Sequence, residues 1–160
     1  MRLVVAAVGR LKRGPDRDLA ERFHDRAVTA GRALGFRAID LVELEESQAR
    51  RAEERIAAEG AALAGHVPAA AFAVALDRRG DNLTSETLAQ RLAGWRDQGV
   101  PATVFLIGGA DGLAEELCRR ARLRLAFGAA TWPHQLARIM LLEQIYRSMT
   151  ILAGHPYHRP

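Results

Sequence analysis

The sequence is poor in cysteine and lysine. Cys118 is the single cysteine among 160 residues, which excludes an internal disulfide and a multi-cysteine metal site. We interpret Cys118 as a buried core thiol, because it falls within an expected helix and has no adjacent base. Lys12 is the only lysine. A Walker A loop is therefore excluded, since it needs a lysine directly after its last glycine, and only Lys12 could form a Schiff base.

Long hydrophobic runs are also missing. The longest uncharged run, residues 60–76, is shorter than the roughly 20 residues of a membrane helix and is interrupted by Gly65 and Pro68. At the N-terminus a short apolar run ends at Gly9 and Arg10, without the length or the cleavage site of a secretory signal. We therefore expect a cytoplasmic protein with no membrane segment.

Composition and charge fit one folded domain with an excess of cations. The chain is 49% hydrophobic and 26% charged, which argues against disorder and predicts a single domain over residues 1–160. The formal net charge is +4. This charge favours an anionic partner such as nucleic acid, although arginine-rich surfaces also occur in cytosolic proteins without one.

Apolar runs of strand length alternate with longer amphipathic segments, which is typical of an α/β domain. Five strands are expected, at residues 3–8, 36–44, 70–76, 102–107 and 123–127. Helices are expected from Pro15 to Gly35, over 47–64, from a cap at Thr84 or Ser85 to Gly99, in a short segment through Ala121, and over 134–153. Residues 77–82 are expected to form a turn. The pattern predicts a parallel sheet flanked by helices.

The last expected helix, residues 134–153, carries apolar side chains in nearly every direction. A helix that is apolar all round must be covered on several sides. We expect its own sheet and a second copy of the chain to cover it, so the sequence predicts a homodimer.

Two loops with glycine follow the carboxyl ends of buried strands, where parallel α/β sheets bind ligands. The first, residues 108–112, lacks the spacing of a dinucleotide fingerprint, and a tight strand-to-helix turn is its alternative interpretation. A side chain at Gly108 would occupy space that a ligand needs. The second, residues 127–134, has no formal charge and suits adenine or another flat ligand better than a phosphate. His134 either contacts the first-turn amides of its helix or reaches into this pocket.

The end of the chain, residues 155–159, gathers two histidines, a tyrosine and an arginine. A metal site is not expected there, because Pro156 prevents the helix that would align the histidines and no carboxylate follows. Aromatic and cationic side chains suit RNA, by stacking on bases and by binding phosphate. The alternative is a frayed, solvated terminus.

The motifs of the chain carry a resemblance that covers nearly its whole length. They are Leu106-Ile107-Gly108-Gly109-x-x-Gly112-Leu113, Thr131-x-Pro133-His134-Gln135-x-x-Arg138, Glu143-Gln144-x-Tyr146-Arg147 and Tyr157-His158-Arg159. Together they resemble the ribosomal RNA large subunit methyltransferase H family of the SPOUT superfamily. The resemblance implies an α/β domain with a C-terminal deep trefoil knot, an obligate homodimer, and S-adenosylmethionine bound in the knot loops. It also implies methylation of N3 of a pseudouridine in 23S rRNA of the ribosome.

Residue by residue, the resemblance places the cofactor against one strand end and two loops. These contacts are Leu76, Gly108, Phe127, Gly128, Ala129, Ala130, Thr131 and Trp132. The chain departs from the usual pattern at residues 128–130, where longer or hydroxylated side chains are common, and at Trp132, where a smaller apolar residue is typical. Cofactor contact along this loop is therefore left to backbone groups.

Only modest help is needed to remove the proton from a weakly acidic imide such as N3, so positioning supplies most of the rate. His134, Tyr157 and His158 are the candidates for that help. Candidate RNA contacts are Arg138, Tyr157, His158 and Arg159, whereas Glu143 is expected to pair with Arg147 four residues on. Two alternatives stay open: a SPOUT methyltransferase for another RNA position or a ribose hydroxyl, and an RNA-binding factor that has lost the cofactor.

Overall fold

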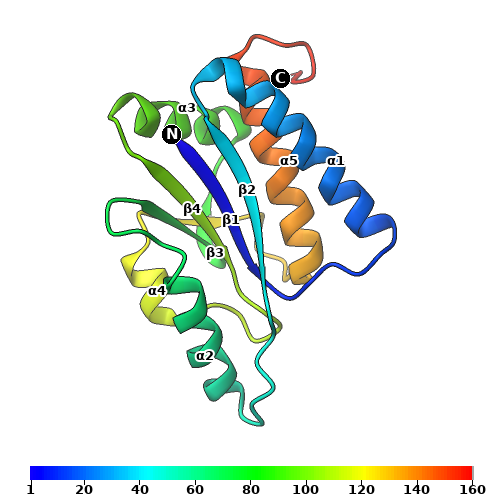
Figure 1. Cartoon of the computed structure of the whole chain (residues 1–160), viewed down its shortest axis with the longest axis vertical. Coiled ribbons are helices and arrows are strands. Elements are labelled where there is room, and N and C mark those ends of the chain that lie inside the picture. Colours follow the sequence, from blue (N-terminus) through cyan, green and yellow to red (C-terminus); the bar gives the residue numbers. More distant parts are fainter. Residues whose placement is uncertain (160) are drawn as a thin grey trace.

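Five parallel strands form the sheet in the computed structural model, which describes residues 1–159 (Figure 1). The strands are β1 (Arg2–Val8), β2 (Ala38–Leu44), β3 (Phe72–Asn82), β4 (Ala102–Ile107) and β5 (Leu123–Ala126). Their order in the sheet is β2-β1-β4-β3-β5, with every neighbouring pair parallel. β4 is buried along its whole length and β1 is buried after its first residue, as continuous apolar runs in a parallel sheet predict.

Helices cover both faces of the sheet, as the sequence predicts. Helices α1 (Pro15–Gly31), α3 (Ser85–Asp97) and α5 (His134–Leu152) pack on one face, and α2 (Ala52–Ala64) and α4 (Glu115–Arg120) pack on the other. The expected cap of α3 is confirmed, because the Thr84 hydroxyl accepts the Thr87 N–H at 3.2 Å. The first helix continues as a 3-10 turn and stops at Gly35, whose φ of +81° favours glycine.

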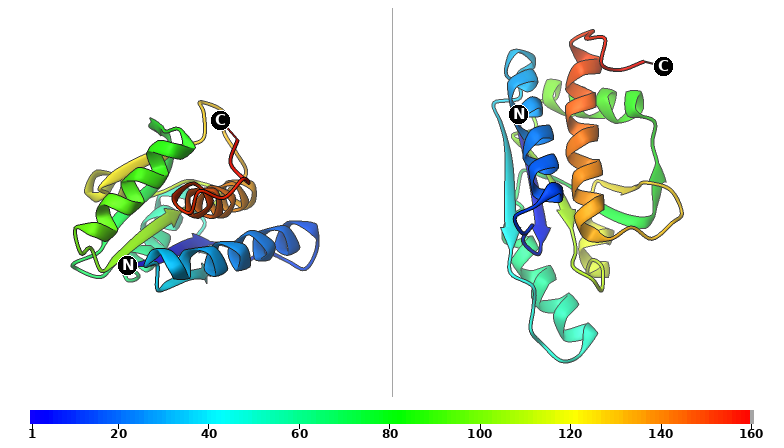
Figure 2. Two further views of the ribbon diagram at one scale, coloured as in Figure 1. Left: turned by 90° about the horizontal axis from the view of Figure 1, so that it is seen from above. Right: turned by 90° about the vertical axis from the view of Figure 1, so that its right-hand side faces the viewer.

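Helix α5 lies between α1 and α3 (Figure 2). Eight of its residues are buried among those helices and the sheet: Arg138, Ile139, Leu141, Leu142, Ile145, Ser148, Met149 and Thr150. The expectation that several sides of this helix are covered is therefore confirmed within one chain. Cover by a second copy stays a prediction, as does the trefoil knot.

Two element boundaries differ from the sequence-based expectation. Residues 77–82 do not form a turn, because β3 continues through a register shift between Leu76 and Asp81 and pairs again with β5. Helix α2 begins at Ala52 instead of Ser47, because Arg55 and Glu59 bind the backbone of residues 47–50 in a non-helical path. Across residues 1–159, no helix has the length and hydropathy to span a membrane.

Candidate active site

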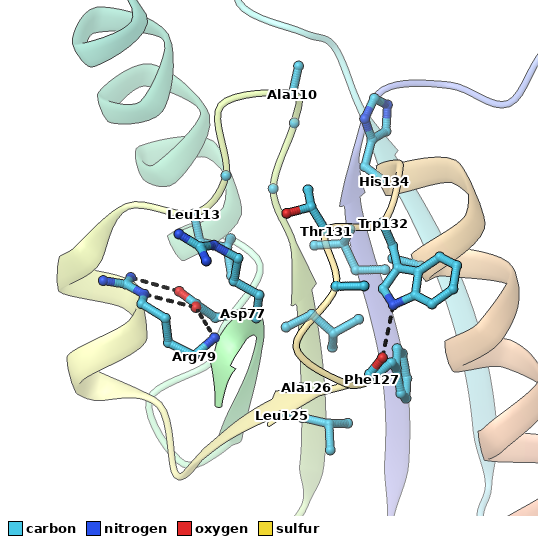
Figure 3. A pocket seen from close by; sticks show the side chains of 18 of the residues that line it. Asp77, Arg79, Ala110, Leu113, Leu125, Ala126, Phe127, Thr131, Trp132 and His134 are labelled. Atoms are coloured by element: carbon cyan, nitrogen blue, oxygen red, sulfur yellow. Dashed lines mark hydrogen bonds and ion pairs between the residues drawn. The ribbon is translucent and has the colours of Figure 1, made fainter. Parts of the chain in front are cut away.

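The candidate site is a cavity of about 440 Å³ at the carboxyl edge of the sheet (Figure 3). The ends of β3, β4 and β5 supply its floor, with Leu76, Ile107 and Leu125 among the lining residues. Both glycine loops and the first residue of α5 complete the wall. The volume suits a ligand of nucleoside size. Of the eight predicted cofactor contacts, all but Ala129 line this cavity.

The first loop, residues 108–112, folds back on itself as a tight turn. The Gly112 N–H donates to the Gly109 carbonyl at 3.1 Å, and Gly112 has a φ of +90°. A Cβ at Gly108 would lie 2.5 Å from the carbonyl carbon and oxygen of Gly112, far inside any allowed contact. The turn interpretation is therefore confirmed, and a side chain at Gly108 would meet the backbone of the turn itself. That it would also occupy space needed by a ligand stays a prediction.

Two side chains of helix α2 support this first loop. The Arg55 guanidinium donates to both carboxylate oxygens of Asp111, at 2.7 and 3.1 Å. One turn further along α2, Glu59 is buried and accepts the Ser47 N–H at 3.0 Å. Its second oxygen lies close to Gly109, where a Cβ would come within 2.8 Å of it. Reasoning from sequence missed both residues, because their partners lie in other elements.

The second loop, residues 127–132, offers backbone groups and almost no polar side chains. Its residues after Phe127 are exposed, and Gly128 has a φ of +90°. Within residues 1–159 two hydrogen bonds tie it down: Asn82 Oδ1 accepts the Gly128 N–H at 2.7 Å, and Trp132 Nε1 donates to the Phe127 carbonyl at 2.9 Å. Thr131 supplies its one hydroxyl.

Oppositely charged side chains from the second half of β3 line the cavity. Arg79 donates to both oxygens of Asp77, at 3.1 and 2.9 Å, as the dashed lines of Figure 3 show, and also to Glu115 at 2.8 Å. The hydrogen bond from Arg79 holds the pKa of the Asp77 carboxyl well below its usual range. Cys118 is 5% exposed, and burial raises the pKa of its thiol. Its interpretation as a core thiol is confirmed.

His134 stands at the mouth of the cavity, on the first residue of α5 (Figure 3). Its side chain is 17% exposed, and Nε2 lies 3.6 Å from a carboxylate oxygen of Glu46. Of the three catalytic candidates, it is the one that the structure places at the cavity.

Arg138 is not available for RNA, so that prediction is wrong. The side chain is 0% exposed. Its guanidinium donates to Glu43 at 2.5 Å and to the carbonyls of Val8 and Gly9 at 3.2 and 2.8 Å. Burial lowers the pKa of this guanidinium, and Glu43 opposes that shift. Arg138 therefore fastens the start of α5 to the ends of β1 and β2.

The tail is folded onto its own chain, so the alternative of a frayed terminus is wrong for Tyr157 and His158. The Tyr157 hydroxyl donates to Glu143 at 3.0 Å, and its ring centroid lies 4.6 Å from that of Tyr146. His158 Nε2 lies 2.8 Å from Glu86. Burial, followed by Glu143, raises the pKa of the Tyr157 hydroxyl. Arg159 is exposed, and the expected pair between Glu143 and Arg147 is present at 2.6 Å.

The structure separates this tail from the cavity. Helix α5 begins at the cavity with His134 and has 19 residues, so it spans about 28 Å. The tail follows its other end, away from the carboxyl edge of β1 (Figure 1). One chain therefore does not bring Tyr157 or His158 to its own cavity. Among residues 1–159, no cluster of three or more histidine, cysteine, aspartate or glutamate side chains is placed to hold a metal.

A parallel sheet with glycine loops and a nucleoside-sized cavity at its carboxyl edge defines an α/β ligand-binding domain. The family described as "Predicted SPOUT methyltransferase" matches residues 1–158, and the chain belongs to this family. It is also similar to proteins named Ribosomal RNA large subunit methyltransferase H. The protein of that name from Afipia carboxidovorans is 64% identical over 99% of both chains, and one from Rhodopseudomonas palustris is 62% identical over the same shares. The family resemblance of the sequence motifs is thus confirmed.

Among solved structures, the SpoU methyltransferase AviRb from Streptomyces viridochromogenes, in complex with the cofactor AdoMet, aligns with 96% of this chain. The identity is 13% and the TM-score is 0.43. This chain spans 61% of that one.

Proposed function

We propose that this protein transfers the methyl group of S-adenosylmethionine to N3 of a pseudouridine in 23S rRNA, on the assembled ribosome in the cytoplasm. The proposal is supported above all by the name and the 57–64% identity of relatives that match along their whole length. The net charge of +4 suits an RNA substrate. We extend to this chain the deep trefoil knot and the homodimer that the family resemblance implies.

The cavity fits the adenosyl part of the cofactor. Its volume of about 440 Å³ suits a nucleoside. The loop 127–132 carries no charge, and it leaves backbone donors and acceptors free to meet the edge of a flat base. S-adenosylmethionine, when bound, supplies an electrophilic methyl group on its sulfonium. The chain then has to hold the two reactants in line, which accounts for most of the rate.

His134 is the residue we assign to the proton of N3. His134 lines the cavity, and Glu46 lies 3.6 Å from its Nε2. A ring nitrogen of the neutral imidazole then accepts the N3 proton of the target base. Changing His134 to Gln should lower kcat about 100-fold with the affinity for S-adenosylmethionine unchanged. An unchanged kcat would remove His134 from this role.

Tyr157, His158 and Arg159 are assigned to contact with RNA, in the pocket of the partner subunit. The proposal is supported by the helix of about 28 Å that separates the tail from its own cavity. Within its own chain Tyr157 donates to Glu143 and its pKa is raised, so a phenolate base is disfavoured there. The tail therefore supplies stacking and cationic contacts to the RNA.

Mixed dimers test this arrangement. One chain ends before His155, and the other is full-length but carries Gly108→Val in the cofactor loop. Neither homodimer should methylate ribosomes above one tenth of the normal rate, whereas the mixture should recover activity because one tail and one intact cavity meet across the interface. Lack of recovery with confirmed heterodimers would refute the action of the tail across the interface. A truncated homodimer with the full rate would leave the tail without a role in RNA binding.

The reaction itself is tested by nucleoside analysis of 23S rRNA from a strain that lacks the gene. Loss of one N3-methylpseudouridine, restored by the gene, is the expected result. Loss of a different methylated nucleoside would support a SPOUT methyltransferase for another position. No loss, together with no heat of binding when S-adenosylmethionine is titrated into the protein, would support an RNA-binding factor without a cofactor.

A further inference from the structure

Few contacts with the rest of the described chain hold the loop 127–132 in place. Residues 128–132 are exposed. Residues 128–130 are glycine and two alanines, so they bring no side chain long enough to anchor the loop in the core. Within the described chain, no backbone-to-backbone hydrogen bond of the turns and loops involves residues 127–132. A loop of this kind loses much conformational entropy when it closes on a ligand.

Asn82 supports the start of the loop, and the path of β3 explains why it can. The register shift of β3 pairs Asp81 with Leu125 and Asn82 with Ala126. Gly80 permits this close return, because a Cβ there would lie 2.5 Å from the Arg124 carbonyl oxygen. The shift places the Asn82 carboxamide beside the first loop residues, where Oδ1 accepts the Gly128 N–H at 2.7 Å.

Trp132 closes the loop from its other end. Its indole N–H donates to the Phe127 carbonyl at 2.9 Å, so the side chain of the last loop residue binds the backbone of the first (Figure 3). The ring is 44% exposed and lines the cavity. A side chain so exposed adds little to the core, which leaves the hydrogen bond as its main contact with the rest of the loop.

We propose that Asn82 and Trp132 are positioning residues that hold the loop 127–132 in its ligand-binding shape before the ligand arrives. The ligand of this loop is an adenosyl group, and that part of the inference depends on the function proposed above. Both residues act through the loop backbone: Asn82 through the Gly128 amide and Trp132 through the Phe127 carbonyl. The cost of ordering the loop is then already met in the free protein, and affinity rises accordingly.

Matched variants separate the hydrogen bonds from the bulk of the side chains. Trp132→Phe keeps a ring and removes the N–H, while Asn82→Ala removes the acceptor and Asn82→Asp keeps one. Arg119→Ala, which trims an exposed side chain outside the cavity and outside α5, is the control. Each variant is melted, titrated calorimetrically with S-adenosylmethionine, and assayed on ribosomes.

Trp132→Phe and Asn82→Ala should each raise the Kd for S-adenosylmethionine about five-fold, the effect of one neutral hydrogen bond. KM should rise with it, while kcat and the melting temperature stay unchanged. Asn82→Asp and Arg119→Ala should bind like the wild type. In hydrogen exchange without ligand, the Gly128 amide, which donates to Asn82 Oδ1, should exchange faster in the two weakened variants.

Two results would overturn the proposal: unchanged affinity in both weakened variants, or unchanged exchange of the Gly128 amide in Trp132→Phe, where the acceptor on Asn82 is still present. A wild-type protein that binds no S-adenosylmethionine would refute the proposed function instead. The exchange experiment needs no ligand, so it still decides whether Asn82 and Trp132 hold the loop.

Discussion

Replacing Arg138 by alanine tests the assignment of this residue to the fold and not to the RNA. The change removes a buried cation from Glu43 and leaves the carbonyls of Val8 and Gly9 without their donor. Removing one partner of a buried ion pair costs about 3–5 kcal/mol. The Glu43 side chain is 28% exposed and keeps the Leu11 N–H as a donor, so we expect the lower end, about 3 kcal/mol.

That loss should appear as a fall of about 6–12 °C in the melting temperature of a domain of this size. Thermal melting followed by circular dichroism measures it, with a urea titration at 25 °C to give the free energy of unfolding. Arg138→Lys should give an intermediate fall, because a single ammonium does not reach Glu43 and two carbonyls in the fork geometry of a guanidinium. Arg119→Ala, which removes an exposed pair with Glu116, should leave the melting temperature unchanged.

A different result would contradict the structural role of Arg138. If Arg138→Ala melts like the wild type and the folded variant binds rRNA at least ten-fold more weakly, the residue contacts RNA and its buried position is not the functional one. A stability loss with RNA affinity unchanged below the new melting temperature supports the structural role.

Two further predictions concern the cavity. Gly108→Ala should abolish binding of S-adenosylmethionine in calorimetry, because its Cβ would meet the Gly112 backbone at 2.5 Å; normal affinity in the folded variant would contradict this. Arg79 holds the pKa of Asp77 below its usual range, so the carboxylate stabilises the fold at neutral pH, and this contribution is lost as the pH falls below about 4. Asp77→Asn should flatten the fall in melting temperature between pH 5 and 3, and an unchanged acid profile would contradict the assignment.

The parts of the fold that were predictable from sequence are those in which one residue pattern determines the environment. Strands β1 and β4 are continuous apolar runs, and in an α/β chain such runs belong in the middle of a parallel sheet. The two loops at the carboxyl edge followed from the predicted ends of β4 and β5. The length and the covered faces of α5 followed from apolar residues on nearly every side of it.

The parts that were missed depend on partners far away in the chain. Arg138 lies among apolar residues in the sequence. Its neighbours in the chain do not indicate that it binds Glu43, which precedes it by 95 positions. The charged segment 77–82 has the composition of a turn, and it became a strand because Gly80 lets the chain pass the Arg124 carbonyl. Asn82 was overlooked for the same reason, since its position opposite Ala126 exists only after that register shift.

The position of α5 has a consequence for biosynthesis. Its apolar residues complete the core against the first strand of the chain, with Leu3, Val5 and Ala7 in the same cluster as Leu141, Leu142 and Ile145. A ribosome that makes the chain from its N-terminus releases α5 after the five strands and the other four α-helices of the described chain. The part of that sheet face that lies between α1 and α3 therefore stays uncovered until synthesis is nearly complete, and the nascent protein depends on α5 to protect this apolar surface from aggregation.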